Sequence, residues 1–115
     1  MTPKSAVGAL AALAHPGRLE IFRRLVRAGR AGLAAGEVAR ATQTLPNTLS
    51  ANLNVLSHAG LITSRRQGRS IIYAAAYEAM SDLLAFLMED CCGGDAEICA
   101  PLAQIASRAA CCEPA

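Results

Sequence analysis

The sequence of 115 residues lacks several features that mark common protein classes. No apolar run approaches the roughly 20 residues that a membrane-spanning helix needs, so we expect no membrane segment. No catalytic base, nucleophile pair or phosphate-binding loop can be recognised, and we therefore expect that the chain is not an enzyme. Tryptophan is absent, and neither of the two histidines lies close in sequence to a cysteine.

Cysteine is missing from the first 90 residues and then occurs five times, at Cys91, Cys92, Cys99, Cys111 and Cys112. Lys4 and the apolar run of residues 6–14 resemble a short signal peptide. However, Val7, Leu10 and Leu13 fit one face of a helix, and cleavage here would remove that helix from the core. We therefore expect a cytoplasmic protein, whose reduced thiols act as ligands or sensors.

Acidic residues are scarce in the first two thirds of the chain, which the net charge of +2 conceals. Up to Tyr77 there are ten basic residues and two acidic ones, which gives +8; beyond it Arg108 stands against seven acids, which gives −6. This asymmetry indicates a polyanion as the partner of the first part.

The periodicity predicts a mainly α fold of five helices and a two-stranded β-hairpin. Helices are expected before His15, over residues 17–27 and 37–41, from Pro46 to about Gly60, and over residues 77–90. A glycine-punctuated loop is expected over residues 28–36. We predict two regions, a domain over residues 1–90 and a cysteine-rich tail over residues 91–115.

The fourth predicted helix has an apolar side and a polar side. Leu45, Leu49, Leu53 and Leu56 fall on the apolar side. Six residues on the opposite side are candidates for DNA contact: Asn47, Thr48, Ser50, Ala51, Asn54 and His58. Such side chains can contact base edges in the major groove. Together with the short helix before it, this helix predicts a helix-turn-helix.

Two β-prone runs on either side of Gln67-Gly68 predict a hairpin that forms a basic wing. We expect its tip to carry Arg65, Arg66 and Arg69, which can reach phosphates or the minor groove. The partner that these features favour is double-stranded DNA.

Three segments resemble the ArsR/SmtB family of small winged-helix metalloregulatory repressors: "AHPGRLEIFRRL", "LSANLNVLSHAGLI" and "RRQGRSIIY". The resemblance covers roughly residues 5–90; it departs at Asn52, where many members have a histidine. It implies a homodimer that binds a pseudo-palindromic operator and is released by an inducer. A two-fold dimer would also let two helices meet successive turns of one DNA face. We expect the first and last helices to form its interface.

The cysteine cluster favours a thiophilic ion, because thiolates are soft ligands. Adjacent Cys91 and Cys92 are too close for a relaxed disulfide, yet both can bind one ion. Gly93-Gly94 permits a reversal that returns Cys99 as a third ligand. Three thiolates suit As(III) or Sb(III), whereas structural zinc would need a fourth ligand.

The family comparison points to the same ion. Best-known arsenic sensors carry a "CVC"-type motif on the helix before the recognition helix, but "AAGEVARA" has no cysteine, and the His and acid pairs of zinc sensors are also missing from the last helix. A subgroup of arsenic-responsive members has a vicinal cysteine pair and a third cysteine after the last helix, which "CCGGDAEIC" resembles. We therefore predict an arsenite-responsive repressor in which As(III) binding pulls the end of the last helix.

Alternatives remain open at this point. Cys91 or Cys92 could form a bridge with Cys99 in a redox or reactive-sulfur sensor. A Cd/Zn-type sensor on the same fold is also possible, as is an inducer that is a methylated trivalent arsenical. Cys111 and Cys112 have no third thiol beside them and are weaker candidates for metal ligands.

Overall fold

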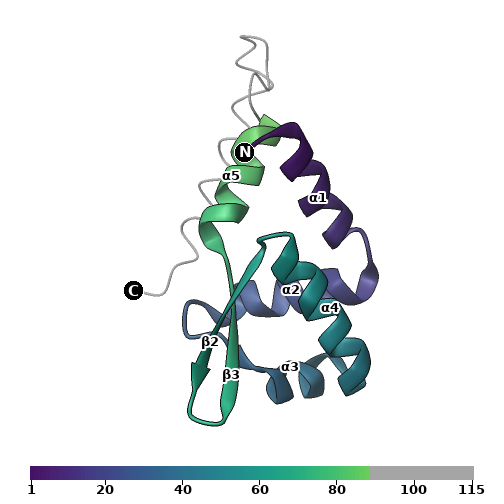
Figure 1. Ribbon diagram of the computed structural model, residues 1–115, viewed down its shortest axis with the longest axis vertical. Coiled ribbons are helices and arrows are strands. Elements are labelled where there is room, and N and C mark those ends of the chain that lie inside the picture. The colour runs from purple at the N-terminus through teal and green to yellow at the C-terminus, as the bar shows by residue number, and fades with distance from the viewer. Residues whose placement is uncertain (89–115) are drawn as a thin grey trace. The chain divides into compact units, whose positions relative to one another are not determined.

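The computed structural model describes residues 1–88 of the chain, and this part contains five helices and three strands. In chain order they are α1 (Pro3–Leu13), α2 (Pro16–Ala28), β1 (Leu33–Ala34), α3 (Ala35–Thr42), α4 (Pro46–His58), β2 (Ile62–Gln67), β3 (Ser70–Ala75) and α5 (Tyr77–Met88). Residues Met1–Leu84 form one compact unit. Within it, α1 and the turn of the β2–β3 hairpin lie at opposite ends (Figure 1). The predicted domain boundary at residue 90 lies outside the described residues.

The helices begin where the local chemistry favours a helix start. Thr2 and Ser5 form a reciprocal capping box at α1, and Pro16 and Pro46 occupy first-turn positions of α2 and α4. Proline suits these positions because its missing N–H would have no partner within the helix. The five predicted helices are therefore confirmed, and α3 extends the predicted span of residues 37–41 at both ends.

The core lies between the helices and the end of the hairpin at which Ile62, Ala74 and Ala75 are buried. Its largest fully buried side chains are Ile21, Leu25, Val38, Leu56 and Leu61. Helix α2 is central, because it contacts α1, α3, α4 and β3. An i,i+4 ion pair lies on its outer side, with 3.2 Å between Arg24 Nε and Glu20 Oε1.

Helix α1 packs through alanines and turns larger side chains outward. Ala6, Ala9 and Ala12 are buried, whereas Val7 is 65% exposed and Leu10 is also exposed. Small side chains let this helix approach α2 and α4 closely. The face defined in the sequence by Val7 and Leu10 is therefore not the face that packs within the chain.

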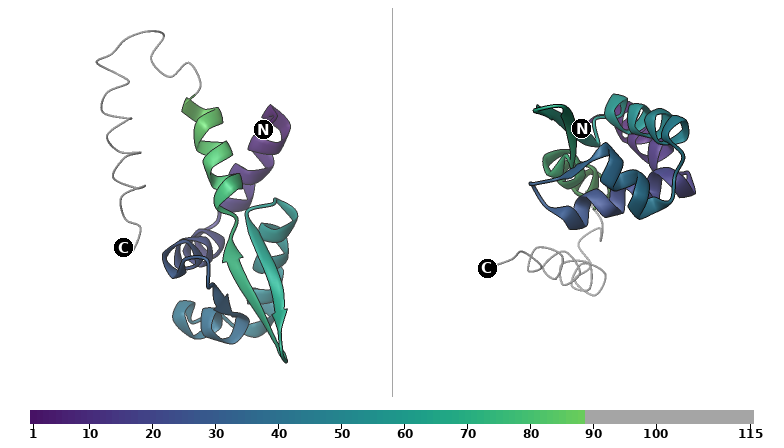
Figure 2. Two further views of the ribbon diagram at one scale, coloured as in Figure 1. Left: turned by 90° about the vertical axis from the view of Figure 1, so that its left-hand side faces the viewer. Right: turned by 90° about the horizontal axis from the view of Figure 1, so that it is seen from below.

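The sheet has three antiparallel strands in the order β1-β3-β2, so the prediction of a two-stranded hairpin was incomplete. Leu33 of β1 pairs with Tyr73 of β3. The hairpin of β2 and β3 projects from the helices in both views of Figure 2. Its turn is Gly68-Arg69, one residue later than predicted, because Gln67 pairs with Ser70. Gly68 has φ of +64°, which suits a two-residue hairpin turn.

Leu45 differs from its predicted place in the core. It precedes the first turn of α4 as the N-cap residue, with extended φ and ψ of −66° and 147°. Helical periodicity does not apply to a residue outside the helix, and Leu45 is 74% exposed. Leu49, Leu53 and Leu56 are buried as predicted.

Gly32 is the position at which the three-stranded sheet depends most on glycine. Its φ is +71°, and a Cβ there would collide with the carbonyl oxygen of Tyr73 in β3. Gly60 has a similar φ of +77°, but a Cβ there would meet nothing within 4 Å. An alanine at Gly60 would therefore meet backbone strain alone, whereas an alanine at Gly32 would meet the same strain and a steric collision.

We predict that Gly60→Ala lowers the free energy of unfolding by about 1 to 2 kcal/mol, which is the cost of left-handed backbone for an L-residue. Gly32→Ala should lower it considerably more, because β1 must also move away from β3. Urea unfolding followed by circular dichroism measures both values. Equal losses in the two variants would contradict the close approach at Gly32.

Candidate nucleic-acid interface

Helix α3, a tight turn and α4 form the helix-turn-helix that the sequence predicts. Gln43 ends α3 in the left-handed region, with φ and ψ of 52° and 47°. Two threonines hold the turn: Thr42 Oγ1 donates to the Val38 carbonyl at 2.8 Å and lies 2.7 Å from Thr44 Oγ1, and the Thr44 N–H donates to the Ala39 carbonyl at 3.0 Å. These bonds fix the direction in which the chain enters α4.

Helix α4 presents its predicted contact residues on the surface. The three buried leucines hold its inner side against the core, and all six candidates on the other side are exposed: Asn47, Thr48, Ser50, Ala51, Asn54 and His58. His58 is the last residue of the helix. The structure therefore brings the six together on one exposed surface.

Asn52 lies on the inner side of α4 and not among these residues. It is 6% exposed, and its Nδ2 is 3.2 Å from the point where a Cβ on Gly17 would lie. In the first turn of α2, His15 Nδ1 accepts hydrogen bonds from the N–H groups of Gly17 and Arg18, at 3.1 and 3.4 Å. The departure from the family at Asn52 thus falls on packing between α4 and α2. His15 is the N-cap residue of α2.

The three wing arginines have different surroundings. Arg65 lies within β2 and pairs with Ile72, so it is not at the tip as predicted. Its guanidinium donates to the Ala31 carbonyl at 2.8 Å and to the Arg30 carbonyl at 3.5 Å. Arg66 is nearer the turn, and Arg69 is in it. The Arg65 side chain therefore ties β2 to the loop after α2.

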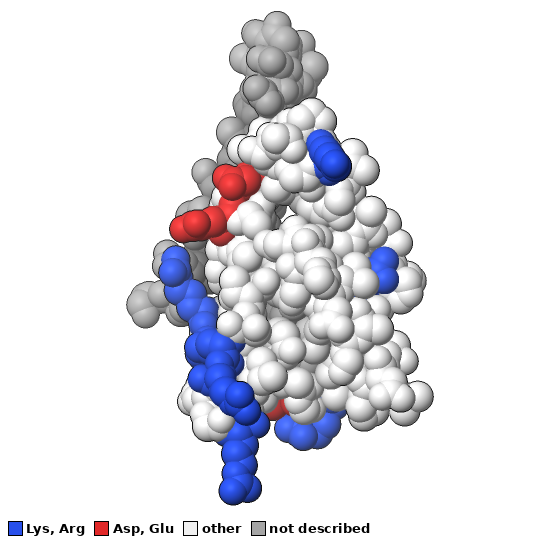
Figure 3. Space-filling model, in the orientation of Figure 1, with Lys and Arg blue, Asp and Glu red and all other residues white. Residues whose placement is uncertain are grey.

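Arg30 joins this surface although the sequence did not single it out. It is exposed, and its own carbonyl accepts from Arg65. Figure 3 shows a continuous band of basic side chains that follows the hairpin, beside an uncharged surface over α4. The acidic groups visible above the band lie over α5. Arg30 lies 35 residues from Arg65 in the sequence, so its place beside the wing follows from the tertiary structure and not from a local pattern.

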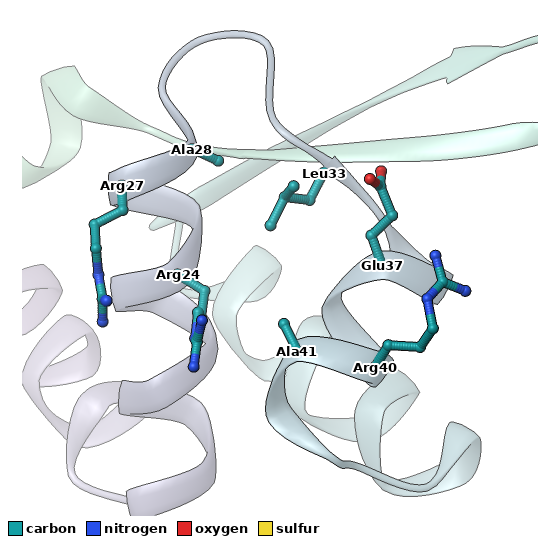
Figure 4. Close-up of a pocket in the computed structure, with 7 residues that line it drawn as sticks. All are labelled: Arg24, Arg27, Ala28, Leu33, Glu37, Arg40 and Ala41. Carbon is teal, nitrogen blue, oxygen red and sulfur yellow. The ribbon is translucent and has the colours of Figure 1, made fainter.

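A shallow hollow of about 600 Å³ between α2 and α3 carries three further arginines. Arg24 and Arg27 extend from α2, whereas Arg40 extends from the far side of α3, so their guanidinium groups do not converge (Figure 4). Glu37 is engaged in its own helix start, because its Oε1 accepts from the Ala34 N–H at 2.9 Å. The hollow therefore gathers positive charge but offers no defined ligand geometry.

The predicted metalloid ligands Cys91, Cys92, Cys99, Cys111 and Cys112 lie outside the described residues. Within residues 1–88, no group of three histidine, cysteine or acidic side chains could hold a metal ion. In the same part of the chain, no helix is long and apolar enough to cross a membrane.

Known proteins resemble this chain in sequence and in fold. A helix-turn-helix domain family matches residues 13–65. The homodimeric winged helix-turn-helix DNA-binding domain from Mycobacterium bovis, a possible ArsR-family regulator, is 32% identical with a TM-score of 0.62; the match covers 74% of this chain and 76% of that one. The chain belongs to the ArsR family of transcriptional regulators. The predicted winged helix-turn-helix fold is thereby confirmed.

Two further relatives of this ArsR-family chain support the assignment. An ArsR-like regulator from Rhodococcus sp. RHA1 is 28% identical with a TM-score of 0.64, over 90% of this chain and 93% of that one. A helix-turn-helix-type transcriptional regulator of Mycobacterium tuberculosis is 38% identical over 74 residues, which is 64% of this chain. The chain spans 62% of the length of this curated relative. These relatives are regulators, in agreement with the expectation that the chain is not an enzyme.

We predict that Arg66→Ala weakens binding to duplex DNA and reduces the dependence of log K on log salt concentration by about two for a dimer on one duplex. The reason is that each subunit loses one cation at the duplex, and each such cation displaces about one counterion. Lys4→Ala is the matched control, because it removes the same charge from exposed α1. Fluorescence anisotropy at several salt concentrations measures both slopes. Equal changes in the two variants would indicate an effect of net charge alone.

Proposed function

We propose that the chain is an arsenite-responsive repressor: a homodimer binds operator DNA through α4 and the wing and dissociates when As(III) binds Cys91, Cys92 and Cys99. The observation that carries DNA binding is the exposed, uncharged polar face of α4 beside the basic band of the hairpin (Figure 3). Family membership supports the role in transcription.

The start of α4 supports contact with the DNA backbone. Leu45 supplies no side-chain hydrogen bond to the first turn, and Pro46 has no N–H. The Asn47 and Thr48 N–H groups point along the helix axis at its positive end, where a phosphate oxygen can accept from them. Such a contact would orient α4, while its side chains meet base edges.

Exposed apolar side chains support a dimer. Val7 and Leu10 project from α1, and on α5 Leu84 is 49% exposed, with Leu87 also exposed one turn further along. Exposed apolar side chains on neighbouring turns of a helix often mark an interface. A symmetric dimer through these helices would cover them and would also place two copies of α4 on one DNA duplex.

The three cysteine thiolates support As(III) as inducer. Three thiolates suit an ion whose lone pair occupies the fourth direction.

Helix α5 supports the coupling of inducer binding to the rest of the domain. The Tyr77 hydroxyl at the start of α5 donates to the Val26 carbonyl of α2 at 2.8 Å. The last described residue of α5, Met88, precedes Cys91 by three positions. Ligand binding after α5 could therefore alter the subunit interface and change the distance between the two recognition helices.

We predict that arsenite releases the reduced chain from DNA in the presence of excess reductant. Cys91→Ser, Cys92→Ser and Cys99→Ser should each abolish release while DNA affinity without arsenite stays unchanged. The double variant Cys111→Ser/Cys112→Ser is the matched control and should still respond. Fluorescence anisotropy on labelled duplex DNA measures the affinity and the release for each variant.

Parallel titrations of the unsubstituted chain with antimonite, a methylated trivalent arsenical, cadmium, zinc and peroxide identify the inducer. Release by peroxide alone would favour a redox sensor and contradict the proposal.

We also predict that Leu84→Glu shifts the chain from dimer to monomer, because it would bury an unpaired charge in the proposed interface. Leu45→Glu is the control, since it changes an exposed leucine at the turn before α4. Sedimentation equilibrium of both variants measures the dissociation constant. A dimer unaffected by Leu84→Glu would exclude this part of α5 from the interface.

A further inference from the structure

The outward face of α4 bears no lysine, arginine, aspartate or glutamate. A helix advances 100° per residue, so Asn47, Ala51, Asn54 and His58 follow the centre of the face opposite the three buried leucines. Ser50, Thr48 and Val55 flank this line, and all of these side chains are exposed. The surface therefore offers amides, hydroxyls and methyl groups over most of its length.

These groups match one kind of base pair better than the other. An asparagine amide can bond N6 and N7 of adenine at once, and methyl groups contact the thymine C5-methyl. Guanine is recognised mainly by arginine or lysine, which bond O6 and N7 together. Asn47, Ala51 and Asn54 lie along the centre of the outward face and are therefore the strongest base-contacting candidates. None of them favours guanine.

The hairpin gives an independent indication of the same base composition. Arg69 lies in its two-residue turn, and Arg66 lies in the last pair but one before it, so both side chains are near the end of the hairpin. Both are exposed. A narrow minor groove has an enhanced negative potential that attracts arginine, and runs of A·T pairs have the narrowest minor groove. Arg65 is tied to the loop after α2, which leaves the other two to enter the groove.

We infer that the chain selects operators with A·T pairs at two places in each half-site, under α4 in the major groove and beneath the wing in the minor groove. At the first place Asn54 bonds adenine, and Ala51 and Val55 contact thymine methyls. At the second place Arg66 and Arg69 enter the minor groove, where a narrow groove binds them more strongly than a wide one. This inference rests on the proposed DNA-binding function and specifies the sequence class.

Selection from a random duplex pool with the reduced, full-length chain tests the inference. We expect enriched duplexes to carry A·T pairs at both places in each half-site. Enrichment of G·C pairs under α4, or binding without sequence preference, would overturn the inference while DNA binding itself stands. Failure to retain any duplex at low salt would overturn the proposed function as well.

Inosine substitution in the selected duplex distinguishes recognition in the major groove under α4 from recognition in the minor groove beneath the wing. An inosine–cytosine pair resembles G·C in the major groove but lacks the guanine amino group in the minor groove. Replacing an A·T pair under α4 should therefore lower affinity about tenfold, whereas replacing one beneath the wing should change it less than about twofold. The reverse pattern, or equal losses, would overturn the assignment of α4 and wing to the two grooves.

A variant tests the role of a single side chain. Selection with Asn54→Arg should change one adenine per half-site to guanine, because arginine bonds guanine O6 and N7. Ser57→Arg is the matched control, since it adds the same charge to the last turn of α4 and should leave the selected bases unchanged. An unchanged adenine in the Asn54→Arg selection would overturn the contact assigned to Asn54.

Discussion

The burial of Leu49, Leu53 and Leu56 is the constraint on which the proposed interface depends. These side chains hold α4 against α2 and the rest of the core, each contributing about 1.5 to 3 kcal/mol on burial. Because they lie on one side of the helix, the opposite side must face solvent. Small polar residues can occupy that side at little cost to stability, so the fold determines where α4 is available for DNA and the surface residues determine what it contacts.

Much of this arrangement could be predicted from the sequence, since helical periodicity and helix-start signals are local. The helix expected from Pro46 begins at that residue, and the helix expected over residues 17–27 differs by only one residue at each end from α2. The six candidate side chains of α4 are exposed for the same reason. Each of these features depends on residues within about one helical turn of one another.

The differences arise where a residue's place depends on a distant part of the chain. Strand β1 has only two residues, and it exists because β3 pairs with it across about 40 positions of sequence. Arg65 shows the same effect, because its guanidinium is occupied by backbone carbonyls of the loop after α2. The alanines of α1 fill the space against α2 and α4, which leaves Val7 and Leu10 outside. A pattern of apolar residues cannot show whether the covering surface belongs to the same chain or to a second one.

If the chain acts as proposed, two copies of α4 meet one face of the same duplex. Hydroxyl-radical footprinting of the reduced chain on a selected duplex measures this. We expect two protected stretches with centres about one helical turn, or a whole number of turns, apart. Both should disappear together when arsenite is added in the presence of reductant. A single protected stretch, or two that persist with arsenite, would exclude the proposed arrangement.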